Sequence, residues 1–173
     1  WVLDGLDRLN PDDQNALPWL PLAIPDGVLI VASALECPAR EILVKRSFKT
    51  LTISPLQEAE QRDLIKQYLG RYAKQLVAEL RIKILNHPLA GSPLFLRVLL
   101  EELRQCGRYE TLAEQLDCYL AVDTIDDLYE LVLERLELDG ESENVRKVMT
   151  ALWASKAGLS EEELLSFTNL ASL

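Results

Sequence analysis

Ser92-Pro93-Leu94-Phe95-Leu96-Arg97-Val98-Leu99-Leu100-Glu101-Glu102-Leu103 is a stretch whose apolar residues lie nearly all round a helix of 3.6 residues per turn. Such a pattern predicts a helix covered on most sides, at the centre of a small helical bundle. Ser92 can cap this helix and Pro93 can be its first residue, because the first turn does not need the N–H that proline lacks. Gly107 is the expected end of the helix.

Helical periodicity extends on both sides of this stretch. Before it, apolar residues with helical spacing predict two helices, with Leu64, Ile65, Tyr68 and Leu69 on the first and Leu76, Val77 and Leu80 on the second. After it, helices are expected over 109–120 and 124–136, and Asp139-Gly140 then breaks the chain.

The last segment has the spacing of an amphipathic helix, with apolar residues at Val145, Val148, Met149, Leu152 and Trp153. Ser160 and Glu163 are placed to form a capping box for a final helix. Two helices about a Gly-containing turn resemble the opening of a winged helix. Trp153 then has two readings: core packing within a winged helix, or part of a partner surface if nothing covers it.

The first part of the chain has a different pattern. Two short apolar runs, 1–3 before Asp4 and 28–32 before Ser33, are typical of strands buried on both faces in a parallel sheet. The prolines between them leave room for only a short helix near 12–17. A third strand is expected over 49–53, where β-branched residues alternate with others. The expected fold class is therefore α/β followed by mostly α.

The order of four motifs resembles the STAND class of P-loop NTPases, in particular its NACHT and nephrocystin/telomerase-associated members. These motifs are Val2-Leu3-Asp4-Gly5-Leu6-Asp7, Trp19-Leu20-Pro21, Val28-Leu29-Ile30-Val31-Ala32-Ser33 and Gly91-Ser92-Pro93-Leu94-Phe95-Leu96. The resemblance implies three domains: a partial P-loop NTPase core with a three-stranded sheet over 1–55, a helical domain over 56–122, and the start of a winged-helix domain over 123–173.

The resemblance also implies site residues. Asp4 corresponds to the Walker B aspartate of the Mg²⁺ site, and Asp7 to the catalytic acid beside the hydrolytic water. Ser33 corresponds to the first sensor, and Gly91 and Pro93 to a motif near the adenine base. Ordinary structural roles are the alternatives: Asp4 in a solvated turn, Ser33 as a polar strand end and Pro93 as a helix-starting proline.

Two departures from the family pattern limit what the chain is expected to do alone. No glycine-rich loop ending in Gly-Lys and then Ser or Thr is present, so the phosphate cradle is missing. Ala34 stands where many relatives have an arginine after the first sensor. The only histidine, His87, is expected to be an ordinary loop or capping residue. We therefore expect ATP or ADP with Mg²⁺ in the complete protein and none on this chain.

Composition restricts the partners. Eighteen basic against 28 acidic residues give a net charge of −10, which disfavours general binding to nucleic acids or anionic lipid. No apolar run reaches the roughly 18 residues of a membrane span, and the start lacks a signal peptide, so a cytoplasmic location is expected. The chain has no initiator Met and is expected to be a fragment.

Two functions are expected on these grounds. The first is a signalling or scaffold ATPase switch, in which nucleotide state controls domain rearrangement and assembly. The alternative is a degenerate, non-hydrolysing module for protein interaction. Either reading implies as partners other domains of the same chain, and protein partners or self-assembly.

Overall fold

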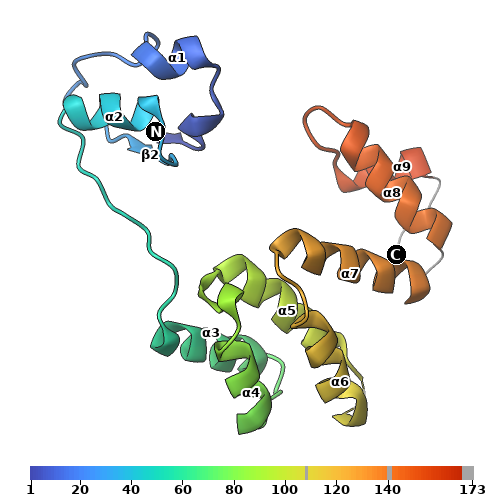
Figure 1. Cartoon of the computed structure of the whole chain (residues 1–173). Coiled ribbons are helices and arrows are strands. Elements are labelled where there is room, and N and C mark those ends of the chain that lie inside the picture. The colour runs from blue at the N-terminus through green and yellow to red at the C-terminus, as the bar shows by residue number, and fades with distance from the viewer. Residues whose placement is uncertain (108, 140–141, 169–173) are drawn as a thin grey trace. The chain divides into compact units, whose positions relative to one another are not determined.

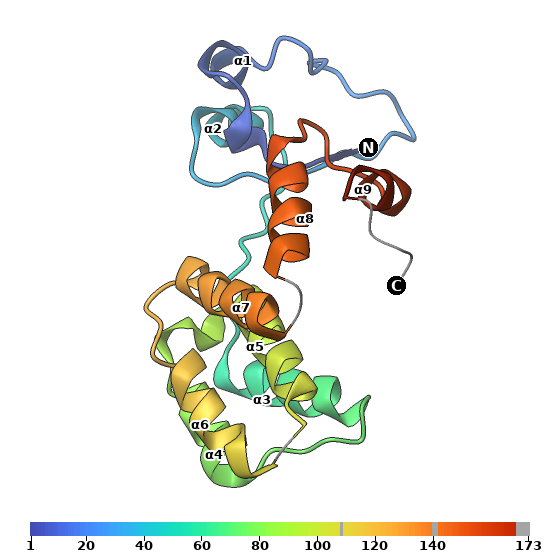
Figure 2. The same cartoon turned by 90° about the vertical axis from the view of Figure 1, so that its right-hand side faces the viewer.

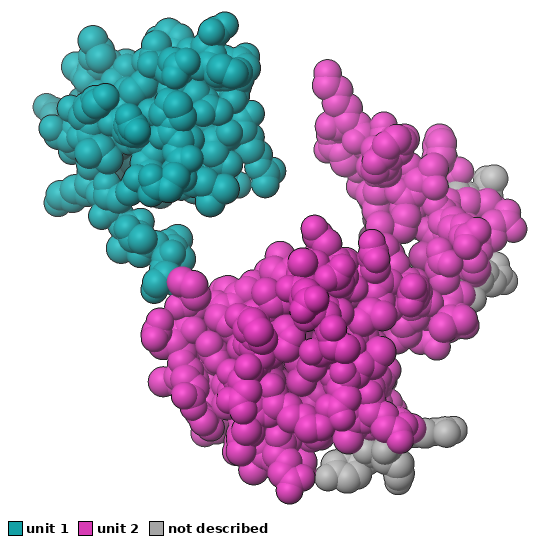
Figure 3. Space-filling model, in the orientation of Figure 1, with its two compact units in different colours: residues 1–54 teal, residues 55–173 magenta. Residues whose placement is uncertain are grey.

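The computed structural model describes residues 1–107, 109–139 and 142–168 (Figure 1). The chain divides into two compact units, Trp1–Ser54 and Pro55–Leu173, which have different colours in Figure 3. We call them the N-terminal unit and the helical unit.

The N-terminal unit combines a very small sheet with short helices. Its elements are, in order, strand β1 (Val2–Leu3), the 3₁₀ helix η1 (Leu6–Arg8), α1 (Pro11–Ala16), β2 (Val31–Ala32) and α2 (Pro38–Lys45). The two strands are parallel, and Val2 lies opposite Val31. Helix α1 lies close to the short helix expected near 12–17; Asn10 caps it and Pro11 is its first residue.

A small apolar core holds the N-terminal unit together. Its buried members are Leu6, Leu17, Leu20, Ala39 and Leu43. Arg46, just after α2, donates hydrogen bonds to the carbonyl oxygens of Leu20 (3.0 Å) and Ala16 (2.9 Å). These bonds fasten the segment after α1 to the end of α2.

The predicted third strand is wrong. Residues 49–53 have no regular secondary structure, and the side chains of Leu51 and Ile53 are 87% and 89% exposed. A strand is stable only where a neighbour takes up its backbone hydrogen bonds. The sheet of the described residues has the order β1-β2, and no strand at 49–53 joins it. The β-branched residues of this segment therefore have no sheet to pack on.

The helical unit contains the remaining elements. They are α3 (Glu58–Gly70), α4 (Ala78–Leu85), the 3₁₀ helix η2 (Pro88–Gly91), α5 (Pro93–Gln105), α6 (Tyr109–Tyr119), α7 (Ile125–Asp139), α8 (Ser142–Ala154) and α9 (Glu161–Thr168). Helix α5 packs against α3, α6 and α7, as Figures 1 and 2 also show. The prediction of a central helix starting at Pro93 is thus confirmed.

Local chemistry sets the ends of these helices. The Ser92 hydroxyl accepts a hydrogen bond from the N–H of Phe95 at 3.3 Å, which caps α5. Ser160 and Glu163 form the predicted capping box, since the Glu163 carboxylate accepts from the Ser160 N–H at 2.8 Å and the Glu163 N–H donates back to the Ser160 hydroxyl at 3.3 Å.

The core of the helical unit is apolar and surrounds α5. Its fully buried side chains on α5 are Phe95, Leu96, Leu99 and Leu100. Burying one such side chain stabilises a fold by about 1.5–3 kcal/mol. Within the described ranges, every helix is too short or too polar to cross a lipid bilayer.

The predicted fold class is wrong as a whole. The described residues form a sheet of two strands with two residues each, instead of three strands of a P-loop NTPase sheet, and are otherwise mostly helical. Residues 125–139 and 142–168 are helices and connecting turns. The expectation that these strands are buried on both faces is also wrong, since Val2, Leu29 and Val31 are exposed. A strand in the middle of a parallel sheet is covered by neighbours on both faces, and two strands of two residues do not provide that cover.

Candidate functional site

Three of the predicted site residues lie together in the N-terminal unit. Asp4 follows β1 and Ser33 follows β2, so the parallel pairing brings them side by side. The Ser33 hydroxyl donates to the Asp4 carboxylate and accepts from the N–H of Gly5 at 2.8 Å. Asp7 accepts a hydrogen bond from the N–H of Leu35 at 3.1 Å.

These contacts show what the polar strand ends do within the fold. Each one satisfies a backbone N–H or a hydroxyl in the turns that follow the strands. Gly5 has φ 71°, a conformation that glycine adopts without strain, and it places its N–H toward Ser33. Among the described residues, no group of three or more His, Cys, Asp or Glu side chains is arranged to hold a metal ion.

Gly91 and Pro93 belong to the helical unit. The carbonyl oxygen of Gly91 accepts from the N–H of Leu56 at 2.8 Å, and a Cβ atom on Gly91 would lie 2.9 Å from the Cβ of Pro55. Glycine is therefore needed here for close approach of two chain segments. Pro93 is the first residue of α5. The roles in Mg²⁺, phosphate and adenine binding that the resemblance implies for these five residues stay predictions.

His87 has the capping role expected from the sequence. Its Nδ1 atom accepts from the N–H of Leu89 at 3.2 Å, and its ring stacks on Phe95 with centroids 4.8 Å apart. These two contacts fix the turn that leads into α5.

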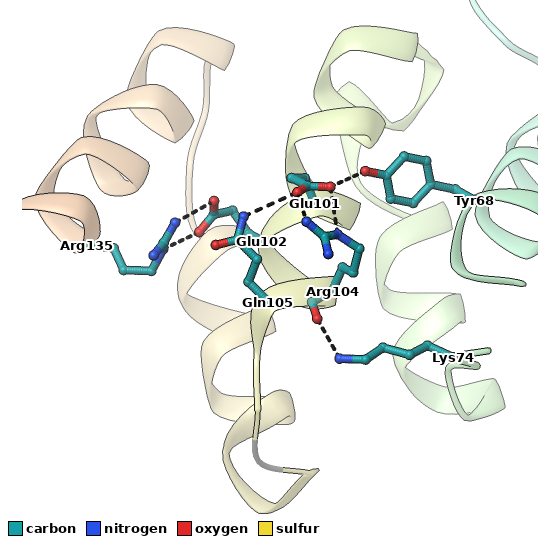
Figure 4. A network of polar contacts seen from close by, with 7 residues as sticks. All are labelled: Tyr68, Lys74, Glu101, Glu102, Arg104, Gln105 and Arg135. Atoms are coloured by element: carbon teal, nitrogen blue, oxygen red, sulfur yellow. Dashed lines mark hydrogen bonds and ion pairs between the residues drawn. The ribbon is translucent and has the colours of Figure 1, made fainter. Parts of the chain in front are cut away.

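A buried polar network joins α5 to α6 and α7; Figure 4 shows its Glu102–Arg135 pair. Glu102 is only 4% exposed, and its carboxylate accepts from Arg135 Nε and from Arg135 Nη2, the latter at 2.9 Å. The Tyr119 hydroxyl donates to the same carboxylate at 2.8 Å. Burial and this hydrogen bond raise the pKa of Tyr119 to about 12. Arg135 and Tyr119 therefore compensate the negative charge of Glu102 inside the helical unit.

A second cluster joins α5 to α3. Glu101 accepts from the guanidinium of Arg104 and from the hydroxyl of Tyr68. The hydrogen bond from Arg104, followed by that from Tyr68, lowers the pKa of the Glu101 carboxyl to about 2. Arg104 also lies over the ring of Tyr72, 4.5 Å from its centroid. Together the two clusters fix α5 against three other helices.

The C-terminal helices expose large apolar side chains. Leu138 of α7, Trp153 of α8 and Phe167 of α9 are 86%, 88% and 76% exposed. The alternative of core packing for Trp153 is thus wrong for the described residues, and the alternative of an uncovered side chain is the one that the structure shows. Tryptophan and phenylalanine are enriched at protein–protein interfaces.

Sequence reasoning missed the charged residues inside the helical unit. Glu102 lies three residues after Leu99 and so on the buried face of α5, and a buried carboxylate requires a cationic partner. That signal was present in the sequence. Its partner, Arg135, is 33 residues away, and no local pattern connects the two.

The chain resembles proteins described as tetratricopeptide repeat proteins. It is 32% identical over 170 residues to a TPR repeat-containing protein of Dictyostelium discoideum, an alignment that covers 95% of this chain and 10% of that protein. It is 25% identical to tetratricopeptide repeat protein 41 of Mus musculus, over 95% of this chain and 14% of that protein. The corresponding values for tetratricopeptide repeat protein 41 of Rattus norvegicus are 24%, 98% and 15%.

The chain therefore spans about a tenth to a seventh of the length of these relatives. No family model matches the chain, and no solved structure matches it significantly.

These comparisons correct the predicted family and function. The relatives are described by their tetratricopeptide repeats, and the sheet has two short strands in place of the three that a P-loop NTPase core was expected to contribute. The assignment to the STAND and NACHT class, and with it the ATP-dependent switch, is overturned. The four motifs are short, and structural roles such as the close approach at Gly91 account for residues in them.

Proposed function

We propose that this chain is a protein-interaction segment of a larger scaffold protein, and that it acts by binding another protein. The observation that carries the proposal is the alignment of nearly the whole chain with proteins described as tetratricopeptide repeat proteins. Helical repeats of that class stack into extended surfaces that bind partners.

The C-terminal helices provide the contact surface in this proposal. Trp153 has the largest exposed fraction of the chain's described tryptophans, and tryptophan is enriched among the residues that dominate binding energy. Met149 and Leu152 of the same helix are 42% and 38% exposed. Arg135 pairs with Glu102 and so joins α7 to α5, and α8 packs on α7.

Site-specific photocrosslinking in cells tests the proposal. A photoreactive phenylalanine analogue replaces Trp153 in the full-length protein, and the control carries it at Lys147, an exposed position on the same helix. We expect a discrete crosslinked protein from position 153 and not from position 147. A crosslink only within the protein's own polypeptide contradicts the proposal, because α8 would then be an internal packing surface.

The captured protein is then purified and its affinity measured. Trp153→Ala should weaken binding by roughly 30-fold or more, the effect of losing about 2 kcal/mol at a central aromatic residue. Lys147→Ala should change the affinity little, since the exposed ion pair with Glu143 contributes little. Equal affinities of the two variants would refute the assignment of the surface.

A further inference from the structure

Two adjacent cavities lie on either side of the segment that joins α3 to α4. The first has a volume of about 280 Å³ and is lined by Ile65, Lys66, Leu69, Gly70, Lys74, Gln75, Leu76 and Arg81. The second has a volume of about 240 Å³ and adds Leu103, Cys106, Gly107 and Leu112 to four of the same residues. We call the first the cationic cavity and the second the apolar cavity. They share Leu69, Lys74, Gln75 and Leu76, so one elongated ligand can reach both.

The charge of the cationic cavity is opposite to that of the chain. Its lining includes Lys66, Lys74 and Arg81 and no carboxylate, although the chain has 28 acidic residues and a net charge of −10. Three cations without an anion in one small cavity repel one another, so the site favours a negatively charged group.

Arg81 provides a second, independent observation. Its Nε atom is buried and has no hydrogen-bond partner, and within the part of the chain that the structure describes it is the only buried side-chain nitrogen or oxygen in this condition. Arg104 and Arg135, by contrast, each have a carboxylate partner. A buried N–H without an acceptor is unfavourable. Because this Nε atom has almost no exposed surface, a ligand anion in the cavity would act on the charge of the guanidinium and on its terminal Nη atoms.

The other two cations are placed differently. The ammonium group of Lys74 donates to the carbonyl oxygens of Cys106 and of Arg104 at the end of α5, the latter bond being drawn in Figure 4. Lys74 lines both cavities. A lysine ammonium has three N–H donors, so one remains for a ligand. Lys66 is exposed on α3. The cationic cavity thus combines one half-buried guanidinium, one ammonium anchored by the end of α5 and one ammonium at its rim.

We infer that the two cavities bind a peptide segment of another protein in which an acidic residue stands next to an apolar one. The carboxylate enters the cationic cavity and accepts from Arg81, whose planar guanidinium offers two parallel donors to a carboxylate. The apolar side chain enters the other cavity against Leu103 and Leu112. Charge complementarity and the apolar second cavity favour this occupant over a free anion.

This site is separate from the Trp153 surface. The inference goes beyond the proposed function, and a failure of either leaves the other standing because the two experiments use different residues.

Fluorescence anisotropy with labelled ten-residue peptides tests the inference on the full chain. The probe alternates Asp and Leu; one control replaces Asp by Asn, and the other replaces Leu by Ser. We expect the Asp-Leu peptide to bind and both controls to bind roughly tenfold more weakly, the scale of one charge-assisted hydrogen bond or one buried side chain. Failure of the Asp-Leu peptide to bind at millimolar concentration overturns the inference.

Matched variants locate the binding. Arg81→Gln should weaken the Asp-Leu peptide roughly tenfold, whereas Arg97→Gln, an equal change of charge at an exposed position of α5, should not. Lys66→Gln removes an exposed cation at the rim and should weaken binding even if Arg81→Gln disturbs folding. If the Arg81→Gln variant is folded, and both it and Lys66→Gln bind the Asp-Leu peptide with unchanged affinity, the inference is overturned. So does Arg81-dependent binding of inorganic phosphate with no binding of the peptide, which would indicate a phosphate site.

Discussion

Replacing Arg135 by Met should destabilise the helical unit strongly, because it leaves the Glu102 carboxylate buried without its cation. Glu102 is 4% exposed and Arg135 19%, so water reaches the pair only from the side of the arginine. Breaking a buried ion pair from one side costs about 3–5 kcal/mol. We expect about 3 kcal/mol, the lower end, since Tyr119 still donates to Glu102 at 2.8 Å and water can enter beside residue 135.

A variant in which both residues of the pair are replaced distinguishes the cost of a buried unpaired charge from the loss of the ion pair itself. In Glu102→Met with Arg135→Met, no charge stays buried, and replacement of a buried pair by apolar residues is often close to neutral. The double variant should therefore be more stable than Arg135→Met alone. Arg62→Met is the control, because the Arg62–Glu58 pair is exposed and should contribute less than about 1 kcal/mol.

Hydrogen exchange of the α5 backbone amides is the suitable assay, since it reports the stability of the helical unit independently of the N-terminal unit. A loss of about 3 kcal/mol corresponds to roughly hundredfold faster exchange of the most protected amides. An Arg135→Met effect as small as that of Arg62→Met, or a double variant less stable than the single one, would refute the reasoning.

Two further predictions concern packing and pH. Gly91→Ala should destabilise the helical unit by about 1–3 kcal/mol, because the new Cβ would lie 2.9 Å from that of Pro55; Gly70→Ala, where nothing lies within 4 Å, is the control, and equal thermal stability of the two variants would contradict the explanation. The pKa of Tyr119 rises from 10.0 to about 12 on folding, so its contribution to stability is complete below pH 10 and decreases between pH 10 and 12. Tyr119→Phe should flatten this decrease in thermal unfolding measured across that pH range, and an unchanged pH profile would argue against the assignment; Tyr68, with a similarly raised pKa, supplies part of the remaining slope.

Features that depend on neighbours in sequence were predictable. The cap at Ser92, the proline at the start of α5 and the capping box of Ser160 with Glu163 are all present as expected. Each depends on residues within one helical turn, so the sequence carries the whole of the physical cause.

Features that depend on distant partners were not predictable in the same way. The prediction of a third strand was wrong because alternating residues at 49–53 form a strand only if another strand lies beside them. The family resemblance failed for a related reason: short motifs such as Gly91-Ser92-Pro93 also serve ordinary packing and capping, and the comparisons with known proteins do not support the nucleotide-binding reading.

The sequence by itself determined where α5 and α9 begin and that α5 is covered on most sides, since capping and apolar periodicity are local properties of the chain. Only the tertiary structure decided that Glu102 meets Arg135, that Arg81 lines a cavity with two lysines, and that Trp153 stays exposed. The physical reason is the same in each case. Burial and pairing depend on which helices pack together, and that packing joins residues tens of positions apart.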